Sequence, residues 1–289
     1  MASDPSAFID LHIHSTASDG TFSASEIIEK ALQLGLSAIS ITDHDPLAGT
    51  REALTFGIPE ALGFVTGVEI STNPPPAFSL SGSMHLLGYG IQVDHPALNE
   101  ELTRLQEARA RRNPEIISRL NQLGFPLSYE ALSASCDGQL SRPHIAREMI
   151  QKGYAFSINE AFDKYLGKGK PAYVDKYRLN WHRAIELIRD SGGIAVLAHP
   201  CLLNLPHEDA LEELIVILTS AGLGGIEVYY PEHTADQTER FKALALRHRL
   251  KMTGGTDFHG ALKPRIQMGV GTGDLRVPYS LYENLIRTR

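Results

Sequence analysis

The 289 residues are 43% hydrophobic and 21% charged, values that exclude an intrinsically disordered chain and fit one large barrel or two ordinary domains. The two cysteines supply no disulfide framework. The sequence shows neither a secretory signal nor an apolar stretch of the ~20 residues that span a bilayer. We therefore expect a cytoplasmic protein with no membrane partner. The net charge of -7 disfavours extended, non-specific binding to nucleic acid.

The first third of the chain alternates between strand and helix patterns. A strand is predicted over Phe8–Leu11, and the helix after it begins with a capping box of Ser23 and Glu26 and ends at Gly35. The buried stripe of this helix is predicted to be Ile27, Ile28, Ala31 and Leu32. Asp45, followed by Pro46, resembles an N-cap and first helical residue. Six further strands are predicted over Ala38–Ile41, Val65–Glu69, Leu86–Gly90, Ile194–Ala198, Ile226–Tyr230 and Lys251–Gly254.

The alternation stops between about residue 95 and residue 180. Helices are predicted there over Glu100–Arg112, Pro114–Leu123, Pro143–Gly153 and Ile158–Leu166, before Trp181–Ser191 resumes the first pattern. Repeated strand-helix units favour a parallel sheet, and functional residues after nearly every strand favour a closed barrel. The prediction is therefore an α/β fold, with a barrel over residues 1–95 and 180–289 and an inserted, mainly helical cap over residues 96–179.

The charge is unevenly distributed between these two parts. Residues 100–180 hold 13 Lys and Arg against 10 Asp and Glu, whereas the rest of the chain holds 14 against 24. An acidic body suits several divalent cations, and a basic segment suits an anionic substrate. Ordinary charge patterning of helix surfaces explains the same balance equally well.

Two histidines one residue apart, His12 and His14, are matched near the other end of the chain by Asp257 and His259. Because alternate residues of a strand point to the same side, each pair aims two possible metal ligands at one point. A single pair of this kind is more often structural, but nine candidates lie at successive strand ends: His12, His14, Asp19, His44, Glu69, His85, His199, Asp257 and His259. Their number predicts a metal centre.

These residues also resemble the motifs of the polymerase and histidinol phosphatase (PHP) superfamily. The matching segments are His12–Ser15 with Asp19, Thr42–Asp45, Glu69, Ala198–Pro200 and Thr256–His259, in the same order over about 250 residues. The resemblance implies a distorted (βα)7 barrel with a trinuclear metal centre. Leu140–Ala146 and Tyr165–Tyr173 look like the bacterial branch that contains 3′,5′-nucleoside bisphosphate phosphatases and enzymes that trim RNA from its 5′ end.

The resemblance also implies a division of the nine ligands. One ion would be held by His12, His14, Glu69 and Asp257, a second by Glu69, His85 and His199, and a third by Asp19, His44 and His259. His85 would point elsewhere if its strand shifted register by one residue. Other PHP proteins carry histidine at the position of Asp19, and its oxygen favours Mn2+, with Fe2+ and Zn2+ as alternatives, at two or three ions per chain.

The predicted chemistry is hydrolysis of a phosphate monoester. Metal ions ~3.5 to 4 Å apart can supply a bridging hydroxide for in-line attack and bind the phosphoryl oxygens, so no protein nucleophile is needed. Candidates for binding the substrate are Arg142, His144, Lys168 and Lys170, with a helix-start surface residue and a solvated turn as the alternatives for Arg142 and the lysines. His233 is the candidate general acid, with an ordinary surface position as its alternative.

The leading hypothesis is a phosphatase that removes one phosphate, by resemblance the 3′-phosphate, from a nucleoside 3′,5′-bisphosphate. Alternatives are a 5′ exonuclease that acts on short RNA and a histidinol-phosphate-type phosphatase. A non-catalytic, metal-stabilised interaction module is disfavoured because all nine positions carry plausible donors. No obligate protein partner is predicted.

Overall fold

The computed structural model describes residues 7–78, 80, 82–135, 140–175, 177–207 and 209–287. All seven predicted strands form within a mixed α/β fold: β1 (Phe8–Ile13), β2 (Ala38–Ile41), β4 (Gly67–Asn73), β5 (Met84–Tyr89), β7 (Ile194–Leu197), β8 (Gly225–Tyr229) and β9 (Lys251–Gly254). Three further strands, β3 (Gly63–Phe64), β6 (Leu179–Asn180) and β10 (Val277–Pro278), escape prediction because two residues are too few to show alternation.

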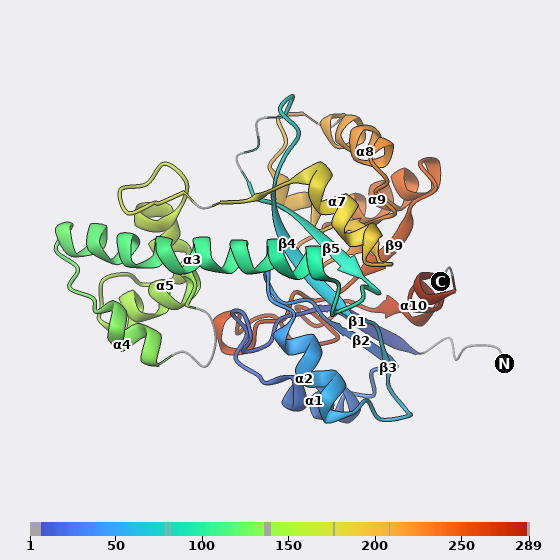
Figure 1. The fold of residues 1–289 in the computed structure, drawn as a ribbon, viewed down its shortest axis with the longest axis horizontal. Helices are drawn as coiled ribbons and strands as arrows, with labels where there is room; N and C mark the ends of the chain where they lie inside the picture. Colours follow the sequence, from blue (N-terminus) through green and yellow to red (C-terminus); the bar gives the residue numbers. More distant parts are fainter. Residues whose placement is uncertain are drawn as a thin grey trace.

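The strands form two sheets, ordered β10-β1-β2-β3 and β6-β4-β5-β7-β8-β9. Isolated parallel bridges between Ile13 and Phe258 and between His44 and Glu69 join segments of the two sheets. The predicted parallel pairing is found for β1 with β2, β7 with β8 and β8 with β9. It is wrong for β5, which runs antiparallel to β4 (both labelled in Figure 1) and to β7. The described residues of the connection from β4 to β5, residues 74–83, contain no helix, and so short a connection returns the chain in the opposite direction.

Six helices pack around the strands: α1 (Ala24–Gln33), α2 (Ala48–Phe56), α7 (Trp181–Asp190), α8 (Ala210–Ser220), α9 (Ala235–Arg247) and α10 (Tyr279–Ile286). The capping box of Ser23 and Glu26 is confirmed. The predicted burial of Leu32 is wrong, because this side chain is 40% exposed beside the buried Ala31.

Asp45 is not the N-cap of α2, which begins only at Ala48 after Leu47. Its backbone instead adopts a left-handed conformation with φ 72°. This turn directs the carboxylate inward, where it accepts hydrogen bonds from Ser71 N (3.0 Å) and Arg109 Nη2 (2.6 Å). Asp45 therefore connects the β2–α2 loop to β4 and to the helical segment.

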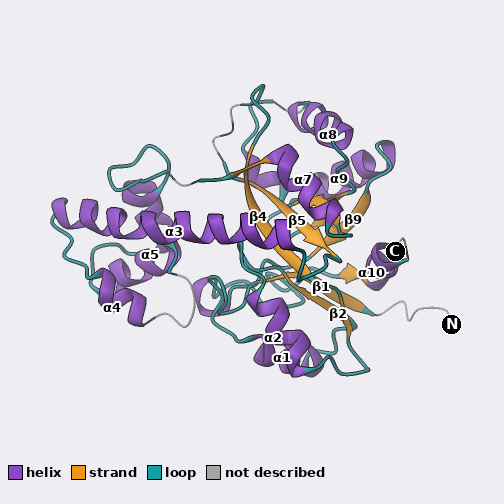
Figure 2. Cartoon of the chain, viewed as in Figure 1, coloured by secondary structure: helices purple, strands orange, loops and turns teal. Residues whose placement is uncertain are grey.

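The helical segment begins with α3 (Pro96–Gln122), which Figure 2 shows extending away from the strands. The break predicted at Pro114 is wrong, because α3 continues through this residue. Before the proline, Leu98, Leu102 and Leu105 pack in the core of the larger sheet, and after it residues 116–120 pack in a second core. Burial on both sides outweighs the cost of one helical proline. This second core joins α3 to α4 (Tyr129–Ala134), which was not predicted, α5 (Arg142–Gln151), α6 (Ile158–Ala161) and a π-helical turn over Phe162–Leu166.

No helix among the described residues combines the length and apolar character needed to cross a membrane. The proposed boundaries of the cap, residues 96–179, stay a prediction.

We expect Ile145→Ala to lower the free energy of unfolding by about 2 to 5 kcal/mol, because it opens a cavity at a fully buried site in the second core. Amide hydrogen exchange should increase mainly within residues 116–174. Leu246→Ala, at a side chain that is 72% exposed, is the control and should change stability by less than about 0.5 kcal/mol. An equal increase of exchange over the whole chain would contradict a separately packed cap.

Candidate metal centre

The nine predicted ligands lie together at one rim of the sheets. His14, His44 and His199 directly or closely follow β1, β2 and β7, while Asp257 and His259 follow β9. His85 lies at the start of its strand rather than at a strand end. Because β5 is antiparallel to its neighbours, this start lies at the same rim as the ends of the parallel strands.

Backbone features near the strand ends direct these side chains. His199 (φ 24°) and Asp257 (φ 54°) are non-glycine residues with positive φ, an unfavourable conformation that concentrates at functional sites. A Cβ on Gly255 would lie 2.3 Å from His12 N, so only glycine allows β9 to approach β1 this closely. Asp43 holds the loop that carries Asp19 by accepting hydrogen bonds from both the amide and the hydroxyl of Ser15.

Glu69 occupies the centre of the site and is completely buried. Its carboxylate contacts five imidazoles: Oε2 lies 3.4, 3.2 and 2.9 Å from His12 Nε2, His14 Nε2 and His44 Nδ1, and Oε1 lies 2.8 Å from both His85 Nδ1 and His199 Nε2. His85 therefore points into the centre, and the register-shift alternative for its side chain is not what the structure shows.

The described ligands form three groups, and within each group the donor atoms all lie within 4.8 Å of one another. The groups are His14, Asp19, His44 and His259; His12, His14, Glu69 and Asp257; and His44, Glu69 and His85. The second group is identical to one predicted set. The other two differ from their predicted sets because His14 and His44 each belong to two groups. His199, which contacts Glu69, is in none of the three groups found among the described residues. Which ion each residue holds stays a prediction.

The chemistry of these donors fits divalent cations. Several buried donors have no hydrogen-bond partner among the described residues, including His12 Nε2, His14 Nε2, Asp19 Oδ1, His44 Nδ1 and Glu69 Oε2. Unpaired buried groups are costly, and cations bound by the donor groups above would satisfy them. Mixed imidazole and carboxylate ligands suit Mn2+, Fe2+ and Zn2+.

Protons and metal ions would compete for the donors at the centre. Burial would raise the pKa of Glu69, but the surrounding imidazoles, His44 and His85 foremost, hold it well below its usual range. Burial lowers the pKa of His44 to about 4. Burial would lower the pKa of His12 and His14, but the carboxylates beside them raise it, well above its usual range for His12 and to about 9 for His14. A cation that binds these two imidazoles would therefore displace protons from them.

A second layer of side chains, which the sequence did not reveal, orients the ligands. Glu227 is fully buried, accepts a hydrogen bond from His12 Nδ1 (2.9 Å) and another from the backbone N–H of His199 (2.7 Å). Tyr230 and Lys263 donate to Asp257 Oδ2 at 3.0 and 2.6 Å. These contacts leave His12 Nε2 and Asp257 Oδ1 directed at the centre.

The predicted substrate and general-acid residues lie at different distances from this centre. Arg142 lines a cavity of about 160 Å³ together with Asp19, His44 and His85. His144 caps its own helix, with Nδ1 2.9 Å from Ser141 Oγ, and Lys170 is exposed. Lys168 lines a neighbouring cavity.

His233 packs instead beside the rings of Tyr230 and Phe241, and its Nδ1 donates to the carbonyl oxygen of Val228. Its role as general acid stays a prediction.

Three arginines that were not predicted line the same cavity as Arg142: Arg109, Arg112 and Arg178. Arg109 and Arg112 are buried, with exposed fractions of 5% and 6%, and project from one face of α3. Their spacing of three residues within the basic segment is the one signal that could have identified them. We call this space the arginine cavity.

We expect Glu227→Gln to lower metal affinity about 10-fold or more, because a glutamine oxygen can replace only one of the two hydrogen bonds that orient His12 and His199. Metal content after equilibrium dialysis and elemental analysis measures the effect. Glu186→Gln, on the exposed surface of α7, is the control. Unchanged metal retention would show that Glu227 does not position the ligands.

Comparison with known proteins agrees with this geometry. The PHP domain family matches residues 10–194. The chain is 35% identical to a 5′-3′ exoribonuclease of Haemophilus influenzae, over 86% of this chain and 89% of that protein, and 33% identical to a 3′,5′-nucleoside bisphosphate phosphatase of Chromobacterium violaceum, over 88% and 87%. A solved structure of an amidohydrolase from C. violaceum, with bound sulfate and no metal, superimposes with a TM-score of 0.82 at 31% identity and covers 96% of both chains. The chain therefore belongs to the PHP family.

Proposed function

We propose that this protein removes the 3′-phosphate from nucleoside 3′,5′-bisphosphates. At a coarser level, the chain is a metal-dependent phosphoester hydrolase of the PHP family. The observation that carries the finer proposal is the arginine cavity, which is lined both by candidate metal ligands and by four arginines. A substrate with two phosphates would match these two groups of residues.

The charges of the arginine cavity support a second anion site. Arg109 is paired with Asp45, but burial and the neighbouring guanidiniums of Arg142 and Arg109 lower the pKa of Arg112 to about 9. Arg112 Nε also lacks a hydrogen-bond partner among the described residues. Buried cations that face one another are destabilising until an anion lies between them, and a guanidinium matches phosphate oxygens.

The metal ions proposed at the centre, with Mn2+ favoured by the oxygen of Asp19, would activate water and neutralise the phosphoryl oxygens when bound. In the reaction, water oxygen forms a bond to phosphorus, the bond from phosphorus to the 3′ oxygen breaks, and that oxygen takes up a proton. Arg142, packed between the rings of Phe162 and Tyr173, would hold the second phosphate in place.

We also propose that the two sheets are one distorted seven-stranded barrel. The isolated bridges Ile13–Phe258 and His44–Glu69 support this, because they place β1 beside the end of β9 and β2 beside β4. Such a barrel would gather the carboxyl ends of its parallel strands at one face, where the proposed ligands lie.

A 5′ exonuclease that acts on short RNA is the second candidate, supported by the name of the H. influenzae relative. The bond from phosphorus to the 3′ oxygen of the first nucleotide would break, that oxygen would take up a proton, and the phosphate would stay on the 5′ oxygen of the remaining RNA. Histidinol phosphate is disfavoured, because it carries one phosphate and would leave the four arginines of the cavity without a second anion to bind.

A phosphate-release screen with Mn2+ tests the proposal directly. Its substrates are nucleoside 3′,5′-bisphosphates, the 3′- and 5′-monophosphates, histidinol phosphate and 5′-phosphorylated oligoribonucleotides. We expect the bisphosphates to give the highest kcat/KM. No release from any bisphosphate, with turnover of oligoribonucleotides, would replace the first candidate with the second.

Glu69→Gln should reduce turnover by more than about 100-fold, because it removes the charge at the centre of the ligand cluster, where even outer contacts contribute 10- to 100-fold. Circular dichroism should show that the fold is retained. Full hydrolysis by this variant in metal-replete buffer would exclude the proposed role of the metal centre.

Arg112→Met should raise KM for a nucleoside 3′,5′-bisphosphate about 10- to 100-fold, the scale of one lost hydrogen bond to a charged group. KM for the corresponding 3′-monophosphate should stay unchanged, because that substrate has no second phosphate. Arg104→Met, on the exposed face of the same helix, provides the control. Equal losses on both substrates would show that Arg112 does not recognise the second phosphate.

A further inference from the structure

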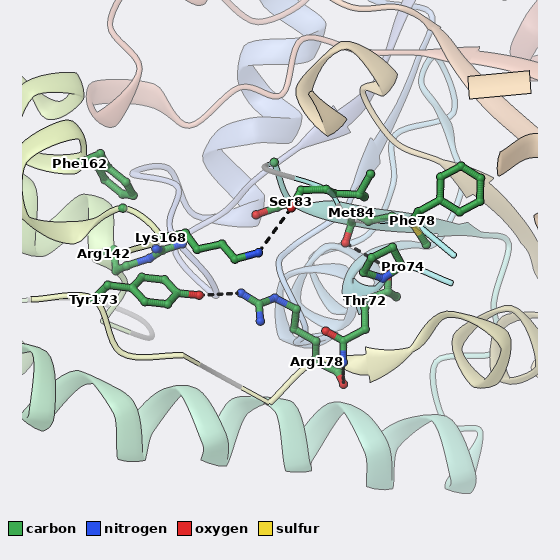
Figure 3. Close-up of a pocket in the computed structure, with 14 residues that line it drawn as sticks. Thr72, Pro74, Phe78, Ser83, Met84, Arg142, Phe162, Lys168, Tyr173 and Arg178 are labelled. Carbon is green, nitrogen blue, oxygen red and sulfur yellow. Dashed lines mark hydrogen bonds between the residues drawn. The ribbon is translucent and has the colours of Figure 1, made fainter. Parts of the chain in front are cut away.

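A second cavity, of about 400 Å³, lies beside the arginine cavity between the β4–β5 connection and the cap (Figure 3). We call it the side cavity. The two cavities share Ser83, Arg142, Phe162 and Arg178, so they meet along a common wall. We propose that the side cavity is a nucleobase site, an inference that rests on the proposed function because it assumes a nucleotide substrate.

The basic side chains of the side cavity favour anionic over cationic ligands. Arg142, Lys168 and Arg178 line it, and no carboxylate is found among its described lining residues. Arg178 is paired with Asp175 outside the cavity, and its Nη2 donates to the hydroxyl of Tyr173 (3.2 Å). Cationic side chains combined with aromatic rings are typical of sites that bind single-stranded nucleotides.

Aromatic rings lie on two opposite sides of the side cavity. Figure 3 shows Phe78 on one side and Tyr173 and Phe162 on the other. The guanidinium of Arg142 lies 5.2 Å from the ring centroid of Phe162 and 5.8 Å from that of Tyr173, so both of these rings already pack against a cation. Phe78 is partly buried against the main core, which fixes its position, and it is the ring that we expect a base to stack on.

The polar groups of the side cavity are largely engaged by the protein. Thr72 Oγ1 donates to Met84 O (3.1 Å), Asn73 Nδ2 donates to Arg178 O (3.4 Å) and Lys168 Nζ donates to Leu80 O (3.4 Å). A base would therefore meet ring faces rather than a set of free donors and acceptors. Stacking tolerates every base, so purines should bind more tightly than pyrimidines without selection of one base.

The contribution of the base can be measured by comparing ribose 5-phosphate with nucleotides that carry the same sugar phosphate and a base. Isothermal titration calorimetry of the full chain in Mn2+ buffer would measure Kd for ribose 5-phosphate and for AMP, GMP, CMP and UMP. Stacking of one base predicts that the nucleotides bind about 5- to 150-fold more tightly than ribose 5-phosphate. This comparison uses the wild-type protein alone, so it does not depend on the folding of a variant.

Phe78→Leu then tests the position of the base, and Phe156→Leu, at a cap residue that is 94% exposed, is the matched control. Phe78→Leu should remove most of the advantage of AMP and leave the Kd of ribose 5-phosphate unchanged. A loss seen only with the dinucleotide pApA would assign the cavity to the base of a following nucleotide, and this result also supports a nucleobase site.

Two outcomes would overturn the inference. One is equal binding of ribose 5-phosphate, AMP and pApA by the wild-type protein. The other is a Phe78→Leu variant that binds all three ligands as the wild type does, or that weakens all three equally. Either result is separate from a failure of the proposed function, because phosphate release from bisphosphates is measured without these ligands.

Discussion

The site depends on one buried carboxylate. Glu69 is completely inaccessible to solvent and still contacts five imidazoles contributed by four different strands or their loops. Such a group is tolerated only if surrounding charges or cations compensate its lost hydration. The same requirement explains Gly255, which lets two strands approach, and the positive φ of Asp257, because both bring donors close to this carboxylate.

The predictable part of the protein is the part that local spacing determines. His12 with His14 and Asp257 with His259 could be found because i, i+2 spacing on a strand has one geometric meaning, and the seven longer strands could be found from apolar runs. The direction of β5 could not, since it depends on the connection before it rather than on its own residues. Glu227 could not either, because its partner His12 is 215 residues away in the sequence.

Helices were harder to predict wherever tertiary contacts override local preference. A proline normally ends a helix, but α3 passes Pro114 because cores on both sides hold it. Asp45 has the sequence pattern of an N-cap, but its carboxylate is needed by the buried Arg109. Buried arginines are equally hard to identify from sequence, because most arginines on helices lie at the surface.

The continuity of α3 has a consequence for how substrates are distinguished. Its first half is anchored among the strands, its last part is anchored in the cap, and Arg109 and Arg112 lie between the two anchors. The packing on both sides of these residues holds the two guanidiniums in place relative to the strands that carry the metal ligands. If the proposed function is correct, selection between substrates would depend on the distance between their two phosphates, because both anion sites are set by packed parts of the fold.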